Sequence, residues 1–246
     1  MNLLSLSKIE SEEDFLKFEG RNFTVVFTDA ENERSFNRNT DSGIKELNSL
    51  KDRFHVRDIA YLKQIHSDKV FSYKLNCSEF NSNEGDAIVT EEKEVIIGVF
   101  TADCVPVILV DDEKGVSAAV HSGWRGTFES ITLKTVQKMK DEYGCRSENI
   151  KAFIGPHIRK CCYEVSEELK EKFLEKKADI DSDILFSDRN LNLEACIERD
   201  LKDCGIKDEN INSLNLCTYC CESIKLHSYR KSEGSYGRMF AFVILH

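Results

Sequence analysis

Three apolar runs follow one another in the middle of the chain, and they limit the fold more than any other feature. Residues 95–100 (VIIGVF), 105–110 (VPVILV) and 115–121 (GVSAAVH) are separated by four residues in each case. Runs of this length that are apolar on successive positions are typical of strands covered on both faces. Connections this short leave no room for crossover helices, which argues against a purely alternating parallel sheet. The runs therefore predict an α+β protein with mixed β-sheets.

The remaining elements fit one domain. Leu133, Val136, Met139 and Tyr143 are spaced as one face of a helix that begins near residue 127 and is stopped by Gly144. Further helices are predicted at residues 166–176 and 193–204, and further strands at 58–73 with a break near residue 67, 87–90, 151–154, 211–216 and 239–245. The chain has two prolines, no low-complexity linker and no internal repeat. We therefore expect a single domain spanning residues 1–246, with helices flanking the sheets.

Charge and cysteine content restrict the partners and the compartment. The formal net charge is −10, which disfavours a nucleic-acid partner because phosphodiester backbones are repelled. No apolar stretch reaches the roughly 18–20 residues that span a bilayer, so we expect no membrane association. The ten cysteines would suggest disulfides in a small secreted domain, but residues 1–10 lack the pattern of a signal peptide. We therefore expect a cytoplasmic protein with reduced thiols and a small-molecule partner.

His66, Cys104 and His121 each lie at the end or at a break of a predicted strand. Small zinc modules use ligands a few residues apart, whereas these three would converge only through the folded sheet. Two imidazoles and one thiolate leave a tetrahedral ion with a vacant position, which is the arrangement of a catalytic site. By spacing alone, however, ordinary core or surface positions are the better interpretation.

Several sequence blocks occur in a fixed order and carry a resemblance to a known family. The blocks are Gln64-Ile65-His66-Ser67, Gly85-Asp86-Ala87-Ile88-Val89-Thr90, Thr101-Ala102-Asp103-Cys104-Val105-Pro106, His121-Ser122-Gly123-Trp124-Arg125-Gly126-Thr127, Ile154-Gly155-Pro156, Cys162-Tyr163-Glu164-Val165, Cys217-Thr218, Ser228-Tyr229-Arg230 and Gly237-Arg238-Met239. Together they closely resemble the bacterial YfiH/YlmD family, whose older names are polyphenol oxidase and laccase-domain proteins. The resemblance covers nearly the whole chain. It implies one zinc ion bound by His66, Cys104 and His121, in a four-layer α/β/β/α fold.

The same resemblance implies a reaction. It implies a purine nucleoside phosphorylase that acts on adenosine, inosine and 5′-methylthioadenosine, with adenosine deamination as a further activity. The chain departs from the family pattern at Ser35-Phe36-Asn37, at His157, where a small residue is expected, and at Lys231, where a second arginine often follows Arg230. The stretch from residue 40 to residue 58 also looks shortened. We therefore expect the preference among purine nucleosides to differ from that of other members.

Charged residues near these motifs are candidates for catalysis. In deamination, a water of lowered pKa attacks purine C6 while a carboxylate moves protons, and Asp103 and Asp68 are the candidate carboxylates. In phosphorolysis, phosphate attacks C1′ of the ribose as the base departs. Arg125, at the predicted start of a helix, offers a guanidinium beside free backbone N–H groups. Taken without its neighbours, Arg125 is more simply a surface cation.

Five other residues are candidates for contact with nucleoside or phosphate: Asn37, Asp86, Trp124, Arg230 and Arg238. Trp124 is the sole tryptophan, and it would stack on a purine or belong to the core or rim. Asp86 would contact substrate or close a turn. The two arginines would bind an anion or pair with a structural carboxylate.

Three other functions stay open. Copper binds N/S ligands more strongly than zinc, so a copper-loaded site with polyphenol oxidase activity is one alternative, although six histidines are few for a multicopper oxidase. In the second, Cys104 is a nucleophile activated by His121 without a metal, as in a cysteine hydrolase. In the third, the ion is structural and the protein is not an enzyme.

The other cysteines raise the question of a second site. Cys217-x-x-Cys220, followed by Cys221, and the pair Cys161-Cys162 invite a metal-binding or redox interpretation. A single Cys-x-x-Cys without a matching second half is weak evidence. Buried or incidental thiols are therefore the expected interpretation.

Overall fold

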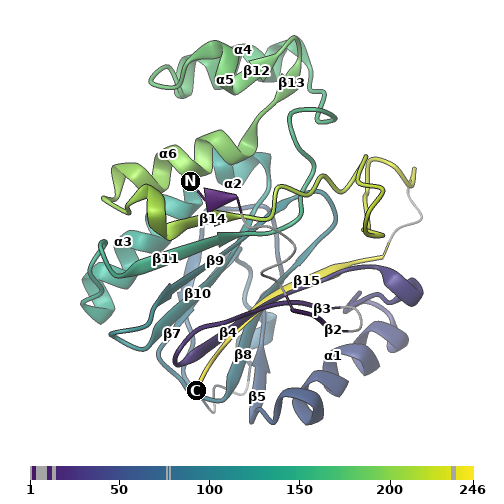
Figure 1. The fold of residues 1–246 in the computed structure, drawn as a ribbon, viewed down its shortest axis with the longest axis vertical. Helices are drawn as coiled ribbons and strands as arrows, with labels where there is room; N and C mark the ends of the chain where they lie inside the picture. The colour runs from purple at the N-terminus through teal and green to yellow at the C-terminus, as the bar shows by residue number, and fades with distance from the viewer. Residues whose placement is uncertain (1, 4–9, 13–14, 76, 78, 234–236) are drawn as a thin grey trace.

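Two large β-sheets lie face to face in the computed structural model (Figure 1). The structure describes residues 2–3, 10–12, 15–75, 77, 79–233 and 237–246. Most of residues 1–10, which lack a signal-peptide pattern in the sequence, lie outside these described residues. One sheet has seven strands, in the order β1 (Asn2–Leu3), β14 (Ile211–Ser213), β11 (Ile150–Ile154), β9 (Val105–Asp111), β10 (Val116–Ser122), β7 (Ala87–Thr90) and β6 (Val70–Ser72). The other has six, in the order β2 (Glu10–Glu12), β3 (Phe15–Glu19), β4 (Phe23–Thr28), β15 (Met239–Leu245), β8 (Val95–Thr101) and β5 (Asp58–Ala60).

The three central apolar runs form β8, β9 and β10, and each is apolar throughout because both of its faces are covered. On β9, Val107 and Leu109 point to the helical side of the sheet, whereas Ile108 and Val110 point into the layer between the two sheets. This alternation follows from the two-residue period of a strand. β9 and β10 form an antiparallel hairpin, while β8 belongs to the other sheet. The chain therefore crosses between sheets at residues 101–104.

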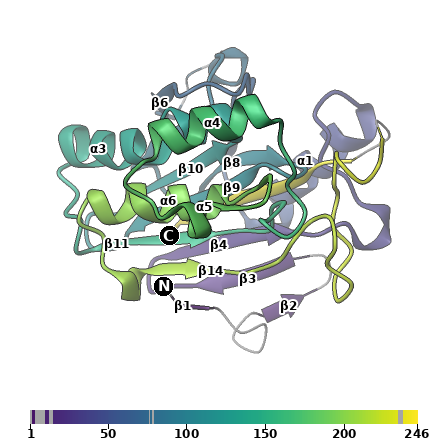
Figure 2. The ribbon, with the colours of Figure 1, turned by 90° about the horizontal axis from the view of Figure 1, so that it is seen from above.

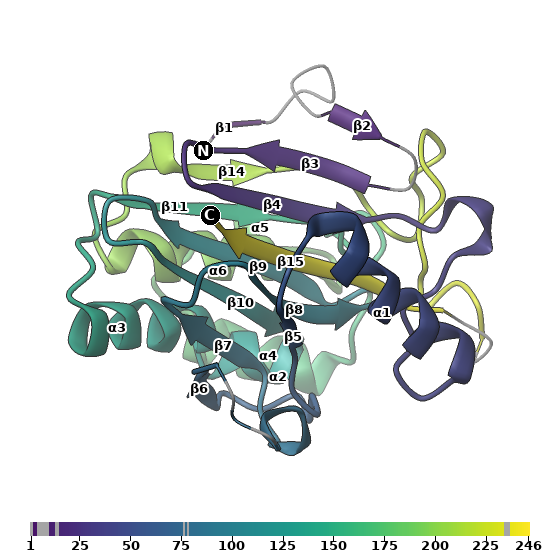
Figure 3. The ribbon, with the colours of Figure 1, turned by 90° about the horizontal axis from the view of Figure 1, so that it is seen from below.

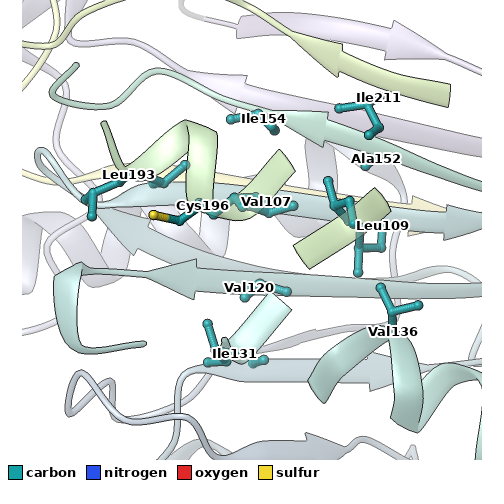
Figure 4. Close-up of a cluster of buried hydrophobic side chains, with 14 of the residues drawn as sticks. Val107, Leu109, Val120, Ile131, Val136, Ala152, Ile154, Leu193, Cys196 and Ile211 are labelled. Atoms are coloured by element: carbon teal, nitrogen blue, oxygen red, sulfur yellow. The ribbon is translucent and has the colours of Figure 1, made fainter. Parts of the chain in front are cut away.

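Helices cover the outer face of each sheet. α3 (Ile131–Tyr143) and α6 (Leu193–Asp203) pack on the seven-stranded sheet, with Ile131 and Val136 of α3 and Leu193 of α6 in one buried cluster (Figures 2 and 4). α1 (Asp41–Phe54) lies on the six-stranded sheet (Figure 3). The predicted α+β class and four-layer α/β/β/α arrangement are confirmed. The smaller elements are η2 (Glu31–Glu33), η3 (Phe80–Ser82), α4 (Glu167–Lys176), α5 (Ser182–Leu185), the hairpin β12 (Phe186–Ser187) and β13 (Asn190–Leu191), and η4 (Asp208–Asn210).

Two local predictions need comment. The helix expected near residue 127 is two helices, α2 (Trp124–Phe128) and α3, because Ser130 between them adopts a left-handed conformation (φ 57°). α3 ends at Gly144 as predicted (φ 68°). α1 was not predicted, since only Gly43, Leu47 and Leu50 are buried in an otherwise polar helix. Within the described ranges, every helix is too short or too polar to cross a bilayer.

Strand direction brings several connections to one edge of the seven-stranded sheet. β10 runs antiparallel to β7 and β9, and β11 runs antiparallel to β9 and parallel to β14. The starts of β7 and β9 therefore lie beside the ends of β10, β11 and β14. This edge carries the candidate site.

Candidate metal centre and substrate cavity

The three predicted metal ligands converge at this edge. His66 lies before β6, Cys104 directly before β9, and His121 near the end of β10. Their ligand atoms all lie within 4.8 Å of one another, and Cys104 Sγ is 3.8 Å from His66 Nε2. A Cβ added to Gly123 would come within 3.0 Å of Cys104 Sγ and 2.9 Å of His66 Cδ2. A larger residue at this position would therefore have to displace the two donors.

Asp86 orients two of these ligands from behind. Its carboxylate is fully buried and lies 2.8 Å from His121 Nδ1. The backbone N–H groups of Ile65, His66 and Ser67 donate to it at 3.3, 3.0 and 2.6 Å, and the Ser67 hydroxyl donates at 2.7 Å. This arrangement holds His66 in its left-handed conformation (φ 59°) and leaves Nε2 of His121 as the ring nitrogen that can bind an ion. Asp86 is buried and does not line the cavity described below, and its contact with substrate stays a prediction.

The electrostatics of the trio favour a thiolate. Burial raises the pKa of Cys104, but the charge of His121 and hydrogen bonds with both histidines outweigh burial and lower it to about 6. Burial lowers the pKa of His121, but the Cys104 charge and the hydrogen bond to Asp86 raise it to about 9. A thiolate and two imidazoles form a donor set that suits zinc or copper. The residues present therefore fit a single metal ion.

A cavity of about 520 Å³ adjoins the trio, a size typical of small-molecule sites. All three donors line it, together with most of the predicted catalytic and substrate-binding residues: Asn37, Asp103, Trp124, Arg125, Arg230 and Arg238. Tyr163, Phe100, Gln64 and Arg38 also line it and were not predicted from the sequence. Tyr163 stands within the sequence block 162–165 and Arg38 directly follows Asn37, so a position within or beside a family motif was the signal that could have identified them.

Four arginines surround this cavity although the whole chain is acidic. Three of their guanidinium groups lie over aromatic rings of the lining: Arg38 over Phe100 at 5.1 Å, Arg125 over Trp124 at 4.9 Å and Arg230 over Tyr163 at 5.6 Å from the ring centroid. Stacking fixes the plane of a guanidinium so that its N–H edge can face an anion. In Arg230 both terminal nitrogens donate to the Glu164 carbonyl at 3.1 Å. Burial lowers the pKa of Arg38, but a guanidinium remains charged at neutral pH.

The two predicted catalytic carboxylates have different positions. Asp103 lines the cavity and adopts φ 87°, and its carboxylate accepts hydrogen bonds from the Thr218 hydroxyl at 2.6 Å and the Arg230 backbone N–H at 2.7 Å. This geometry suits a residue that positions neighbouring loops. Asp68 pairs with Lys134 and lines a different surface hollow. This hollow shares His66, Trp124 and Arg125 with the cavity, and the role of Asp68 in proton transfer stays a prediction.

The structure also brings together cysteines that the spacing had kept apart. The sulfur atoms of Cys161, Cys162, Cys217 and Cys220 all lie within 4.8 Å of one another. Cys161 and Cys162 supply in space the second half that the Cys-x-x-Cys pair lacks in sequence, while the expectation of incidental thiols stays a prediction. Each of the ten cysteines is free.

Known proteins are similar to this chain over most of its length. A family model described as "Multi-copper polyphenol oxidoreductase laccase" matches residues 22–246. A purine nucleoside phosphorylase of Clostridium acetobutylicum is 44% identical over 247 residues, covering 99% of both chains. An adenosine deaminase from an unknown prokaryotic organism is 33% identical, covering 74% of this chain and 73% of its own. The crystal structure of a Bacillus licheniformis hypothetical protein, YfiH, superposes with a TM-score of 0.86 at 23% identity, covering 96% of this chain and 98% of that one.

Proposed function

Because the chain belongs to the laccase-domain family, also called YfiH/YlmD, we propose that it is a metal-dependent purine nucleoside phosphorylase. Its substrates are inorganic phosphate and the nucleosides adenosine, inosine and 5′-methylthioadenosine, and its products are the free base and the ribose 1-phosphate. Deamination of adenosine is a second reaction of the same site. Relatives named purine nucleoside phosphorylase and adenosine deaminase support these two activities.

The observation that carries the proposal is the shared cavity. A trio of metal donors and four arginines line one space, so a substrate with an anionic part and a polar neutral part fits it. In a chain of net charge −10, general attraction does not concentrate phosphate, and placed guanidinium groups must bind it. Arg38, Arg125, Arg230 and Arg238 are the candidates.

In phosphorolysis, a phosphate oxygen forms a bond to C1′ while the bond from C1′ to the purine nitrogen breaks and its electron pair leaves with the base. The arginines hold the phosphate next to C1′, where its negative charge stabilises the positive charge that develops on the ribose. Trp124 and Tyr163 provide aromatic faces for the purine. Asp103 positions the backbone of Arg230. Proton transfer by Asp103 itself stays a prediction.

We assign the metal as one zinc ion held by His66, Cys104 and His121. When bound, zinc polarises a substrate oxygen or lowers the pKa of a bound water. Copper fits the same donors, which accounts for the oxidase description of the family without a multicopper centre. The remaining histidines are placed elsewhere: His157 bonds to the Gly155 carbonyl, His227 to the Arg34 carbonyl, His246 to Thr24, and His55 caps α1. We further propose that residues 1–246 act as one domain in the reducing cytoplasm.

The test is incubation of zinc-loaded protein with inosine or adenosine, with and without phosphate. Phosphate-dependent release of free base and ribose 1-phosphate is expected, with ammonia released from adenosine. Cys104→Ser removes one donor and should abolish turnover, whereas Cys77→Ser alters an exposed thiol remote from the cavity and should not. Absence of turnover by fully metal-loaded protein would refute the proposal.

The Cys104 thiolate beside the His121 imidazolium favours a second candidate function. This function is that of a metal-free hydrolase that uses Cys104 as its nucleophile. Alkylation separates the two functions. If zinc protects Cys104 from iodoacetamide and supports turnover, the thiolate is a ligand. If the metal-free protein turns over an ester substrate and alkylation stops it, the thiolate is a nucleophile.

A further inference from the structure

Four cysteines lie together at the edge of the seven-stranded sheet that carries the candidate site, on two of the connections between its strands. Cys161 and Cys162 lie in the connection that follows β11, and Cys217 and Cys220 lie in the connection that follows β14. β11 and β14 are parallel neighbours, so both connections leave the sheet at the same edge. The four sulfurs, which we call the cysteine cluster, all lie within 4.8 Å of one another.

The spacing within the cysteine cluster matches a tetrathiolate ion site. Zn–S bonds of about 2.3 Å in a tetrahedron place the sulfurs roughly 3.8 Å apart, and Cys161 Sγ lies 3.6 Å from Cys220 Sγ. A disulfide needs about 2.05 Å between sulfurs. Cys217 and Cys220 also have the two-residue separation common to ligand pairs in structural zinc sites.

The backbone around the cluster is fixed by hydrogen bonds between the two connections. The His157 N–H donates to the Leu216 carbonyl at 3.2 Å, and the Thr218 N–H donates to the His157 carbonyl at 3.0 Å. The Cys221 N–H closes a turn on the Cys217 carbonyl at 3.0 Å. The sulfur positions are therefore held by the fold and do not depend on long flexible side chains.

Charge explains why an ion would be held here. Four thiolates this close repel one another, and a bound cation removes that repulsion, so deprotonation of the thiols accompanies metal binding.

We propose that Cys161, Cys162, Cys217 and Cys220 bind a second zinc ion, separate from the one proposed in the cavity. Four protein ligands leave no vacant position, so this ion is structural. It joins the connection that carries Tyr163 to the connection that carries Thr218, whose hydroxyl holds Asp103. The second ion therefore stabilises one wall of the cavity, and its existence does not depend on the proposed reaction.

Metal content of protein purified under reducing conditions and supplied with zinc tests this site. Two zinc ions per chain are expected in the wild type. Cys161→Ser/Cys220→Ser and Cys104→Ser should each retain one ion, and the triple variant should retain none. Cys221→Ser is the matched control, because Cys221 is the next residue in the same connection and stands outside the cluster; it should retain two.

The Cys104→Ser variant also allows a measurement with the cysteine cluster intact. X-ray absorption on its remaining zinc should show a sulfur-only shell at about 2.3 Å, and loading with Co²⁺ should produce the intense thiolate-to-cobalt absorption of a tetrahedral site. Removal of this ion by a chelator should lower the unfolding temperature. A Cys104→Ser protein that binds no metal although the four thiols of the cysteine cluster are reduced, or one that contains a Cys161–Cys220 disulfide, would overturn the proposal.

Discussion

Asp86→Asn tests how the buried carboxylate prepares the metal centre. The Asp86 carboxylate accepts from four donors behind the trio and lies against His121 Nδ1. The asparagine amide has one oxygen that accepts and one nitrogen that donates. The amide nitrogen must therefore face either the His66 N–H and His121 Nδ1, or the three donors of Ile65 and Ser67. The first orientation leaves fewer donors unmet. It also makes Nδ1 of His121 an acceptor and moves the imidazole proton to Nε2, the nitrogen needed by the ion.

The expected magnitudes follow from these contacts. An unmet buried donor costs about 1–3 kcal/mol, so the His66 N–H left facing the amide nitrogen corresponds to about 1–3 kcal/mol of unfolding free energy. A loss of about 3 kcal/mol in a chain of this size lowers the unfolding temperature by roughly 6–12 °C. Loss of a partner behind a metal ligand typically weakens metal binding roughly 10–100-fold.

Competition of the protein with a chromophoric chelator measures the zinc affinity, and calorimetry measures the unfolding temperature. Asp111→Asn is the matched control, because Asp111 is equally buried and accepts N–H groups of Lys114 and Arg146 at the opposite end of β9 from Cys104. It should lower stability and leave zinc affinity unchanged. If folded Asp86→Asn binds zinc within about threefold of wild type, instead of roughly 10–100-fold more weakly, the proposed orienting role is refuted.

Three further predictions address the cavity and its surroundings. In steady-state assays, Arg38→Ala should raise the KM for phosphate by roughly tenfold or more, because it removes the binding energy of a charge-assisted hydrogen bond. An unchanged KM would remove Arg38 from the phosphate site. Asp68→Asn should leave turnover within about twofold of wild type, because this half-exposed carboxylate pairs with a lysine outside the cavity and surface ion pairs contribute little to stability. A large loss of turnover would support a catalytic role for Asp68. Burial raises the pKa of Glu194, but the electrostatic interaction with His157, the hydrogen bond from the Ser213 hydroxyl and the Arg159 guanidinium outweigh burial, and the net shift is downward. The ionised Glu194 therefore stabilises the fold above its ordinary pKa of 4.5, and this stabilisation is lost as pH falls through the lower, folded-state pKa. Unfolding temperatures of wild type and Glu194→Gln should therefore converge in acid, and a constant gap would contradict this.

Local patterns were sufficient for the central strands and several helix ends. β8, β9 and β10 could be located because a strand covered on both faces must be apolar at every position. α3 ends at Gly144, and Ser166 caps α4 by accepting the Leu169 N–H at 3.3 Å. α1 escaped prediction because it buries a narrow stripe of small and aliphatic residues in a polar helix, which leaves a weak periodic signal.

The sequence by itself determined the strands, the chemical types of the metal donors and, through the order of its motifs, the family. Only the tertiary structure distinguished Asp86, fully buried behind the donors, from Asp68, paired with Lys134 outside the cavity. Only the parallel pairing of β11 and β14 showed that Cys161 and Cys162 meet Cys217 and Cys220. The physical reason is that propensity and periodicity describe neighbours along the chain, whereas these sites depend on strand order, strand direction and the crossing between two sheets.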